Sequence, residues 1–145
     1  MFEVLKALIA GDSAPEPPSP ALSTALLLVE LARADFNVAE EEKARILELL
    51  AARFGLDAGK AASLFDEARR RAREAVSLHE YIQTLNSTLG PADKGQLIEM
   101  LWQVAYADGR VDQYEEHLLR KLAELLYVSQ EDYIRAKLKA AGKPI

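Results

Sequence analysis

Two short acidic segments hold the side chains of this chain that are best suited to chemistry. They read ADFNVAEEE and ADGRVDQYE, and they end at Glu42 and Glu115. The second segment follows the later half of an EF-hand calcium loop, with an acid at Asp108, the turn glycine at Gly109, an apolar residue at Val111 and a final acid at Glu115. Carboxylate oxygens in this order predict affinity for a divalent cation, calcium or magnesium.

The earlier half of such a loop is missing from both segments. Its first and third positions fall on Val104 and Tyr106 in one copy and on Leu31 and Arg33 in the other. A complete EF-hand is therefore excluded, because calcium needs about six to eight oxygens. A tight site would need both turns, or one turn with backbone carbonyls and water. The available side chains are Asp35, Asn37, Glu40, Glu41 and Glu42 in one turn and Asp108, Asp112, Glu115 and Glu116 in the other.

The same acids also have a purely structural explanation. Asp112 and Glu115 have the spacing of a capping box, in which each side chain accepts a hydrogen bond from the other's backbone N–H. Glutamates in a helix's first turn complement its dipole, and Gly109 would supply a positive φ between helices. Helix capping and cation binding both stay open on the residues alone.

Helical periodicity runs through the chain after residue 20, with no strand-like alternation. We expect an all-α fold of about seven helices, with helices that begin near residues 20, 40, 58, 78, 91, 113 and 130. The first should reach about residue 34 and the second residue 54. The expected capping residues are Ser19, Asp57, Ser77 with Glu80, Asp112 with Glu115, and Ser129. Trp102 and Tyr106 lie on the most apolar segment and are expected in the core.

An internal repeat relates the two acidic segments. At a shift of 73 residues five positions are identical, namely Ala32/Ala105, Ala34/Ala107, Asp35/Asp108, Val38/Val111 and Glu42/Glu115. We expect two helix–acidic turn–helix units, about 21–75 and 91–141, joined by a helix at about 78–88. Because a three-helix unit buries its apolar faces poorly alone, the units should pack together with approximate two-fold symmetry.

The chain ahead of this domain (21–141) divides into two parts. Residues 1–10 predict an amphipathic helix, and residues 11–20 form a linker with four prolines. The first segment is too short to span a bilayer and lacks a signal peptide's basic start. We expect it to dock on the domain's own core or on a partner. Membrane association is not expected, and only residues 1–10 could provide it.

Composition narrows the function further. The net charge of −5 argues against nucleic-acid binding, and the absence of cysteine excludes disulfides and thiolate chemistry and favours a cytoplasmic location. Four arginines at 69, 70, 71 and 73 fit a solvated helix face or, alternatively, a surface for an acidic partner or anionic membrane.

No catalytic constellation stands out in the sequence. It has no phosphate-binding glycine loop and no nucleophile elbow, and His79 starts no zinc motif because Gln83 replaces its second histidine. His117, close to Glu115, is expected at the surface or beside the acidic turn. A hydrolase using a metal held by two carboxylates is a distant option, and we expect a protein that is not an enzyme.

The stretch from Leu101 to Ala140 resembles the TerB-like family, the tellurite-resistance protein B superfamily, and in particular its stand-alone bacterial members. The pattern lies in Trp102, Ala107-Asp108-Gly109, Asp112, Tyr114-Glu115 and His117-Leu118. The resemblance implies an all-α fold of about seven helices with an internal repeat. It also implies a link to tellurite and other stress responses.

Acids of this family are suspected metal ligands. By position the resemblance assigns that role to Asp35, Glu42, Asp108, Asp112 and Glu115. The first turn departs from the pattern at Phe36 and Ala39, where the second has Gly109 and Asp112, which makes it the poorer ligand set. We therefore expect a non-enzymatic accessory domain of a stress response that binds proteins and a divalent cation. The alternative is a protein-interaction module whose acids only cap helices and whose N-terminal helix docks on the partner.

Overall fold

The structure is a computed structural model, and it describes residues 16–33, 38–74 and 77–142. The predicted N-terminal helix at 1–10 and Asp35 lie outside these ranges. The described residues form helices and no strand, which confirms the all-α fold. The helices are α2 (Pro20–Ala32), α3 (Glu40–Phe54), α4 (Ala58–Glu74), α5 (His79–Thr88), α6 (Pro91–Ala105), α7 (Gln113–Leu125) and α8 (Gln130–Ala140).

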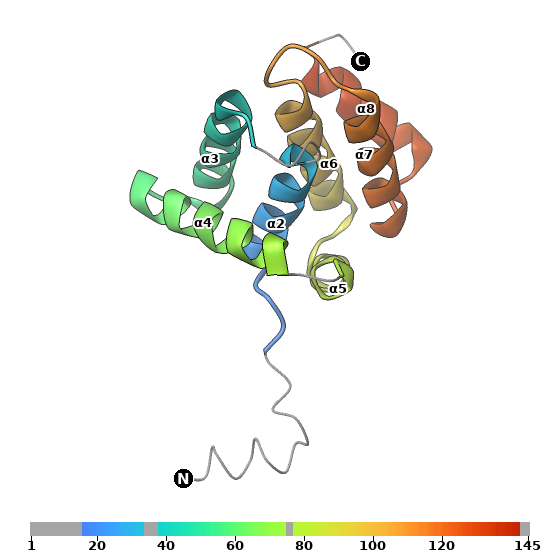
Figure 1. Ribbon diagram of the computed structural model, residues 1–145. Coiled ribbons are helices and arrows are strands. Elements are labelled where there is room, and N and C mark those ends of the chain that lie inside the picture. Colours follow the sequence, from blue (N-terminus) through green and yellow to red (C-terminus); the bar gives the residue numbers. More distant parts are fainter. Residues whose placement is uncertain (1–15, 34–37, 75–76, 143–145) are drawn as a thin grey trace, which may run out of the picture.

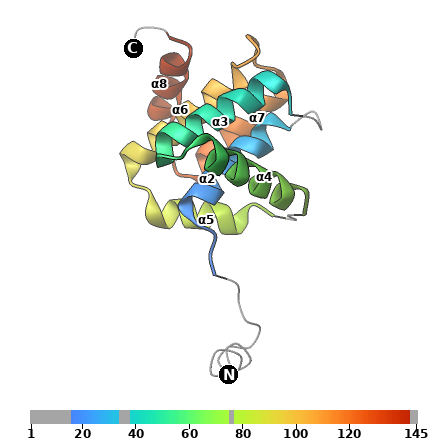
Figure 2. The same ribbon diagram turned by 90° about the vertical axis from the view of Figure 1, so that its left-hand side faces the viewer.

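Helix α2 lies at the centre of the bundle. It packs against α3 and α4 on one side and against α6 and α7 on the other, while α5 crosses below it (Figure 1). The view in Figure 2 shows α3 and α4 covering α2 from one side. Residues 22–29 of α2 are all buried, because its apolar residues surround the helix instead of forming one stripe.

The second half of the core is built around Trp102 of α6. Its ring centroid lies 5.8 Å from that of Tyr106 and 5.5 Å from that of Tyr133 on α8. Trp102 is fully buried, as expected, whereas Tyr106 is only partly buried. No helix among the described residues is both long and apolar enough to cross a membrane.

Most helix starts follow the local signals in the sequence. Ser19 Oγ accepts a hydrogen bond from the backbone N–H of Leu22, and Ser129 Oγ accepts one from that of Asp132. Asp57 Oδ1 accepts a hydrogen bond from the backbone N–H of Lys60. Helix α2 ends at Ala32, two residues before the predicted end, which lies outside the described residues.

The predicted capping box of Ser77 with Glu80 is wrong. Leu78, with φ −88° and ψ −1°, already has a helix-like backbone and occupies the N-cap position of α5. Ser77 Oγ instead accepts a hydrogen bond from His79 N, two residues along the chain. A serine can satisfy a nearby N–H in this local turn, so the spacing to Glu80 was misleading.

The helix pairs α2–α4 and α6–α8 occupy equivalent places in the two predicted repeat units and are both closely packed. The turns after α3 and α7 also correspond, because Gly55 has φ 63° and Tyr127 has φ 60° at matching positions. The two-fold symmetry and the boundaries of the repeat units stay predictions.

Candidate carboxylate site between the two acidic turns

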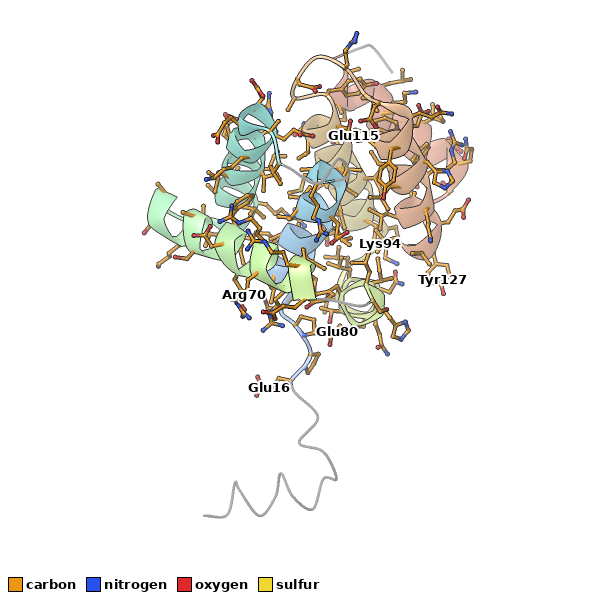
Figure 3. All side chains as sticks on the ribbon, viewed as in Figure 1. Glu16, Arg70, Glu80, Lys94, Glu115 and Tyr127 are labelled. Atoms are coloured by element: carbon orange, nitrogen blue, oxygen red, sulfur yellow. The ribbon has the colours of Figure 1, made fainter. Side chains whose placement is uncertain are left out.

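Glu115 lies in the first turn of α7, next to the capping residue Asp112. Asp112 Oδ1 accepts a hydrogen bond from Glu115 N at 2.7 Å, and Glu115 Oε1 accepts one from Asp112 N at 3.3 Å. This confirms the capping box predicted from the spacing. Glu115 is nevertheless only 6% exposed, which capping alone does not require. In Figure 3, Glu115 lies near one end of α7, and Tyr127 lies beyond the other end.

Glu42 occupies the equivalent place in the first turn of α3. Its Oε1 accepts a hydrogen bond from Ala39 N at 3.4 Å, so it reaches back to the start of its helix as Glu115 does. Ala39 has no side-chain oxygen to return the bond, and α3 has no side-chain cap there. Glu42 is 5% exposed and is one of the few buried charged residues.

The two buried glutamates meet. Their carboxyl groups form a side-chain hydrogen bond, across 73 positions of the sequence. A carboxylate only accepts hydrogen bonds, so a bond between two carboxyl groups requires a proton on one of them. Such a bond forms only where one of the two groups is protonated.

The surroundings of Glu115 explain why it retains a proton. Burial, followed by the hydrogen bond and the negative charge of Glu42, raises the pKa of Glu115 to about 8, while the backbone N–H of Asp112 opposes the shift. Among the described residues, no lysine, arginine or histidine forms a salt bridge with Glu115.

Of the other predicted ligands, Asp112 lies beside Glu115 in the capping box, Asp108 lies in the turn before it, and Asp35 is outside the described residues. Asp108 is exposed, and its Oδ1 accepts a hydrogen bond from Arg110 N at 3.1 Å within its own turn. Asp112 is also exposed and caps α7. The described ranges contain no group of three His, Cys, Asp or Glu side chains arranged to hold a metal ion. Of the predicted ligands, the structure brings together Glu42 and Glu115.

Sequence reasoning included both glutamates but missed their contact and burial. The signal was present in the repeat, because Glu42 and Glu115 are one of its five identical pairs. Residues at equivalent positions in two units related by two-fold symmetry can meet near the axis. The neighbouring acids, the exposed Glu40 and Glu41 and the partly buried Glu116, obscured which members of each acidic run point inward.

The described helices and their paired glutamates define a class: an all-α domain in which the first turns of two helices join through buried carboxyl groups. Comparison with known families then identifies it. The model of the family "Tellurite resistance protein TerB" matches residues 21–138, and the chain belongs to this family. Neither the curated proteins nor the solved structures compared with the chain gave a significant match.

Proposed function

We propose that this TerB-family chain is a non-enzymatic accessory domain of a bacterial stress response, which binds a divalent cation between its two acidic turns. Glu42 and Glu115 are the central ligands, and the cation replaces the proton that they share. The supporting observation is the hydrogen bond between these two buried carboxyl groups. Binding to protein partners in the cytoplasm belongs to the same proposal.

Capping does not account for the burial of the glutamates. Each glutamate needs only one oxygen to accept the N–H at its helix start, and exposed acids serve this purpose well. Bringing two carboxyl groups out of water and against each other costs free energy. A cation between them would offset that cost by neutralising both groups.

The number of ligands favours magnesium over calcium. Calcium needs about six to eight protein or water oxygens, whereas magnesium keeps several waters and often uses only one or two carboxylates. Two carboxyl groups lie together, and the described residues contain no group of three acids arranged to hold a metal ion. Magnesium with its own water shell therefore suits the pair better.

Titration of metal-free protein tests the proposal. Calorimetry and thermal unfolding should be followed with magnesium, manganese, calcium and zinc on wild type, Glu42→Gln and Glu115→Gln. The matched control is Glu124→Gln, an exposed acid on α7. Magnesium at about one hundred times its Kd should stabilise wild type and Glu124→Gln by about 2.7 kcal/mol. It should not stabilise Glu42→Gln or Glu115→Gln.

The shared proton gives a second readout. Because the cation displaces it, magnesium affinity should rise between about pH 6 and pH 8, and calorimetry in buffers of different ionisation enthalpy should detect proton release. Absence of heat and of any change in Tm would contradict cation binding. It would favour the alternative, an interaction module whose acids only cap helices, which the completed capping box at Asp112 supports.

A further inference from the structure

The arginines near the end of α4 divide into two groups with different surroundings. Arg70 lies 2.6 Å from Glu67 and 3.3 Å from Glu74, and Arg71 lies 2.9 Å from Glu67. These hydrogen bonds lower the pKa of Glu67, as expected for an acid between two guanidinium groups. Figure 3 shows Arg70 on the outer side of α4. This first group is neutralised within its own helix.

The second group, Arg69 and Arg73, is one helical turn apart and lines a cavity of about 420 Å³. Two other helices contribute basic side chains, Arg33 from the end of α2 and Lys43 from the first turn of α3. We call this cavity the basic groove; its lining is Arg33, Val38, Glu40, Lys43, Phe65, Arg69 and Arg73. Four of these residues are basic and one is acidic.

Two of the four basic side chains are fixed by neighbours. Arg33 Nη1 donates to Glu30 at 3.2 Å and to the carbonyl oxygen of Ala72 at 2.7 Å. Arg69 lies 3.5 Å from Asp66. Within the described part of the chain, Lys43 and Arg73 form no salt bridge with an acid.

The buried ring of Phe65 brings charges from two helices together. Lys43 Nζ lies 5.5 Å from the ring centroid, and the guanidinium carbon of Arg69 lies 5.6 Å from it. Each contact is favourable by itself, and both cations line the same cavity. An anion in the groove would be attracted by both charges.

We propose that the basic groove binds a phosphate group of a small ligand. Guanidinium groups match the oxygen spacing of phosphate, and lysine adds a compact positive charge. The cavity has the size of small-molecule sites, which span about 300–1,000 Å³. A chain with net charge −5 repels extended polyanions at long range, so a compact anion fits better than nucleic acid or an anionic membrane.

Thermal unfolding and NMR titration with inorganic phosphate and pyrophosphate, at ionic strength matched with sodium chloride, test this proposal. The variants are Lys43→Gln and Arg73→Gln, and the matched control is Arg70→Gln on the other side of α4. Wild type and control should show a saturable rise in Tm with amide shifts around Phe65. Each groove variant should bind at least tenfold more weakly. Glu115→Gln should keep the full response, because this site does not depend on the carboxyl pair.

Three results would overturn the proposal. One is the absence of saturable binding by wild type beyond the effect of sodium chloride. Another is equal loss of affinity in Arg70→Gln and Arg73→Gln, which would indicate general charge screening. The third is binding to vesicles containing phosphatidic acid without binding to pyrophosphate, which would assign the groove to a membrane surface. Circular dichroism of both groove variants checks that each is folded.

Discussion

Glu115 is the residue whose titration should be visible in the stability of the protein. Its folded-state pKa is about 8, against an unfolded value of about 4.3. Between these values the folded state holds a proton that the unfolded state has released, so the free energy of unfolding falls as pH rises. The loss between about pH 5 and pH 8 should exceed about 1.4 kcal/mol, the equivalent of one pKa unit.

Urea denaturation in EDTA at several pH values measures this dependence. Glu115→Gln places a neutral amide against Glu42, so its stability should change less with pH and exceed that of wild type near pH 8. Glu124→Gln should follow wild type. An identical slope in wild type and Glu115→Gln would show that the proton is not held at this pair.

Tyr127 carries a backbone cost that glycine would remove. It is 81% exposed and has φ 60°, the left-handed conformation that glycine has at the matching Gly55. A side chain in this conformation costs about 1 kcal/mol. Tyr127→Gly should therefore raise stability by up to about 1 kcal/mol, less the contact of its ring with Lys94 at 5.7 Å.

Thermal and urea unfolding of Tyr127→Gly and Tyr127→Ala separate the two contributions. Alanine loses the ring contact but keeps the strained backbone, so it should be the less stable of the two variants. If alanine and glycine gave equal stability, backbone strain at residue 127 would not be the cause.

The sequence predicted local contacts between residues better than distant ones. The bond between Asp112 and Glu115 follows from a spacing of three residues, and the structure confirms it. The bond between Glu42 and Glu115 depends on how two helices pack, and no local rule contains that information. Ser77 shows the converse, because its spacing to Glu80 matched a capping box while the backbone of Leu78 placed the helix start elsewhere.

At the level of elements, α3 begins less favourably than α7. Ala39 is the N-cap of α3 and has no side-chain oxygen, whereas Asp112 caps α7. Ala39 already has the extended backbone of a capping residue, with φ −65° and ψ 152°. Ala39→Ser should therefore raise stability by about 1 kcal/mol without adding charge beside Glu42.

The reverse change at the matching position gives the control. Asp112→Ala removes a bond of 2.7 Å to Glu115 N and should lower stability by about 1 kcal/mol. Urea denaturation measures both variants. If Ala39→Ser lowered the stability, the start of α3 would be constrained by something other than its free N–H groups.

Helix ends were predictable because their signals are local, but helix faces were not. The second predicted helix has the bounds found for α3 (Glu40–Phe54), which follow from the glutamates at its start and Gly55 at its end. The four arginines of α4 were visible as a cluster. Which of these arginines line the basic groove could not be predicted, because the groove also needs Lys43 and Arg33 from other parts of the chain.

At the scale of the whole molecule, α2 connects the two halves. It contacts α3 and α4 of the first predicted unit and α6 and α7 of the second, so the cores of both halves pack against it. The sequence showed α2 as a helix with helical periodicity in a repeat unit, and it did not show that its residues 22–29 would all be buried. Such sharing predicts that the protein unfolds in one cooperative step.

Trp102 makes this prediction testable, because it is the only tryptophan and lies on α6. Phe65 is buried on α4, which packs against α2 and α3 and not closely against α6. Phe65→Leu should cost about 1 to 3 kcal/mol through lost packing. If α2 couples the halves, Trp102 fluorescence and far-ultraviolet circular dichroism should shift to the same lower midpoint. Tyr133→Leu on α8, the matched change in the other half, should behave alike. A fluorescence midpoint that stays at the wild-type value in Phe65→Leu, while the dichroism shows two steps, would mean that the halves unfold separately.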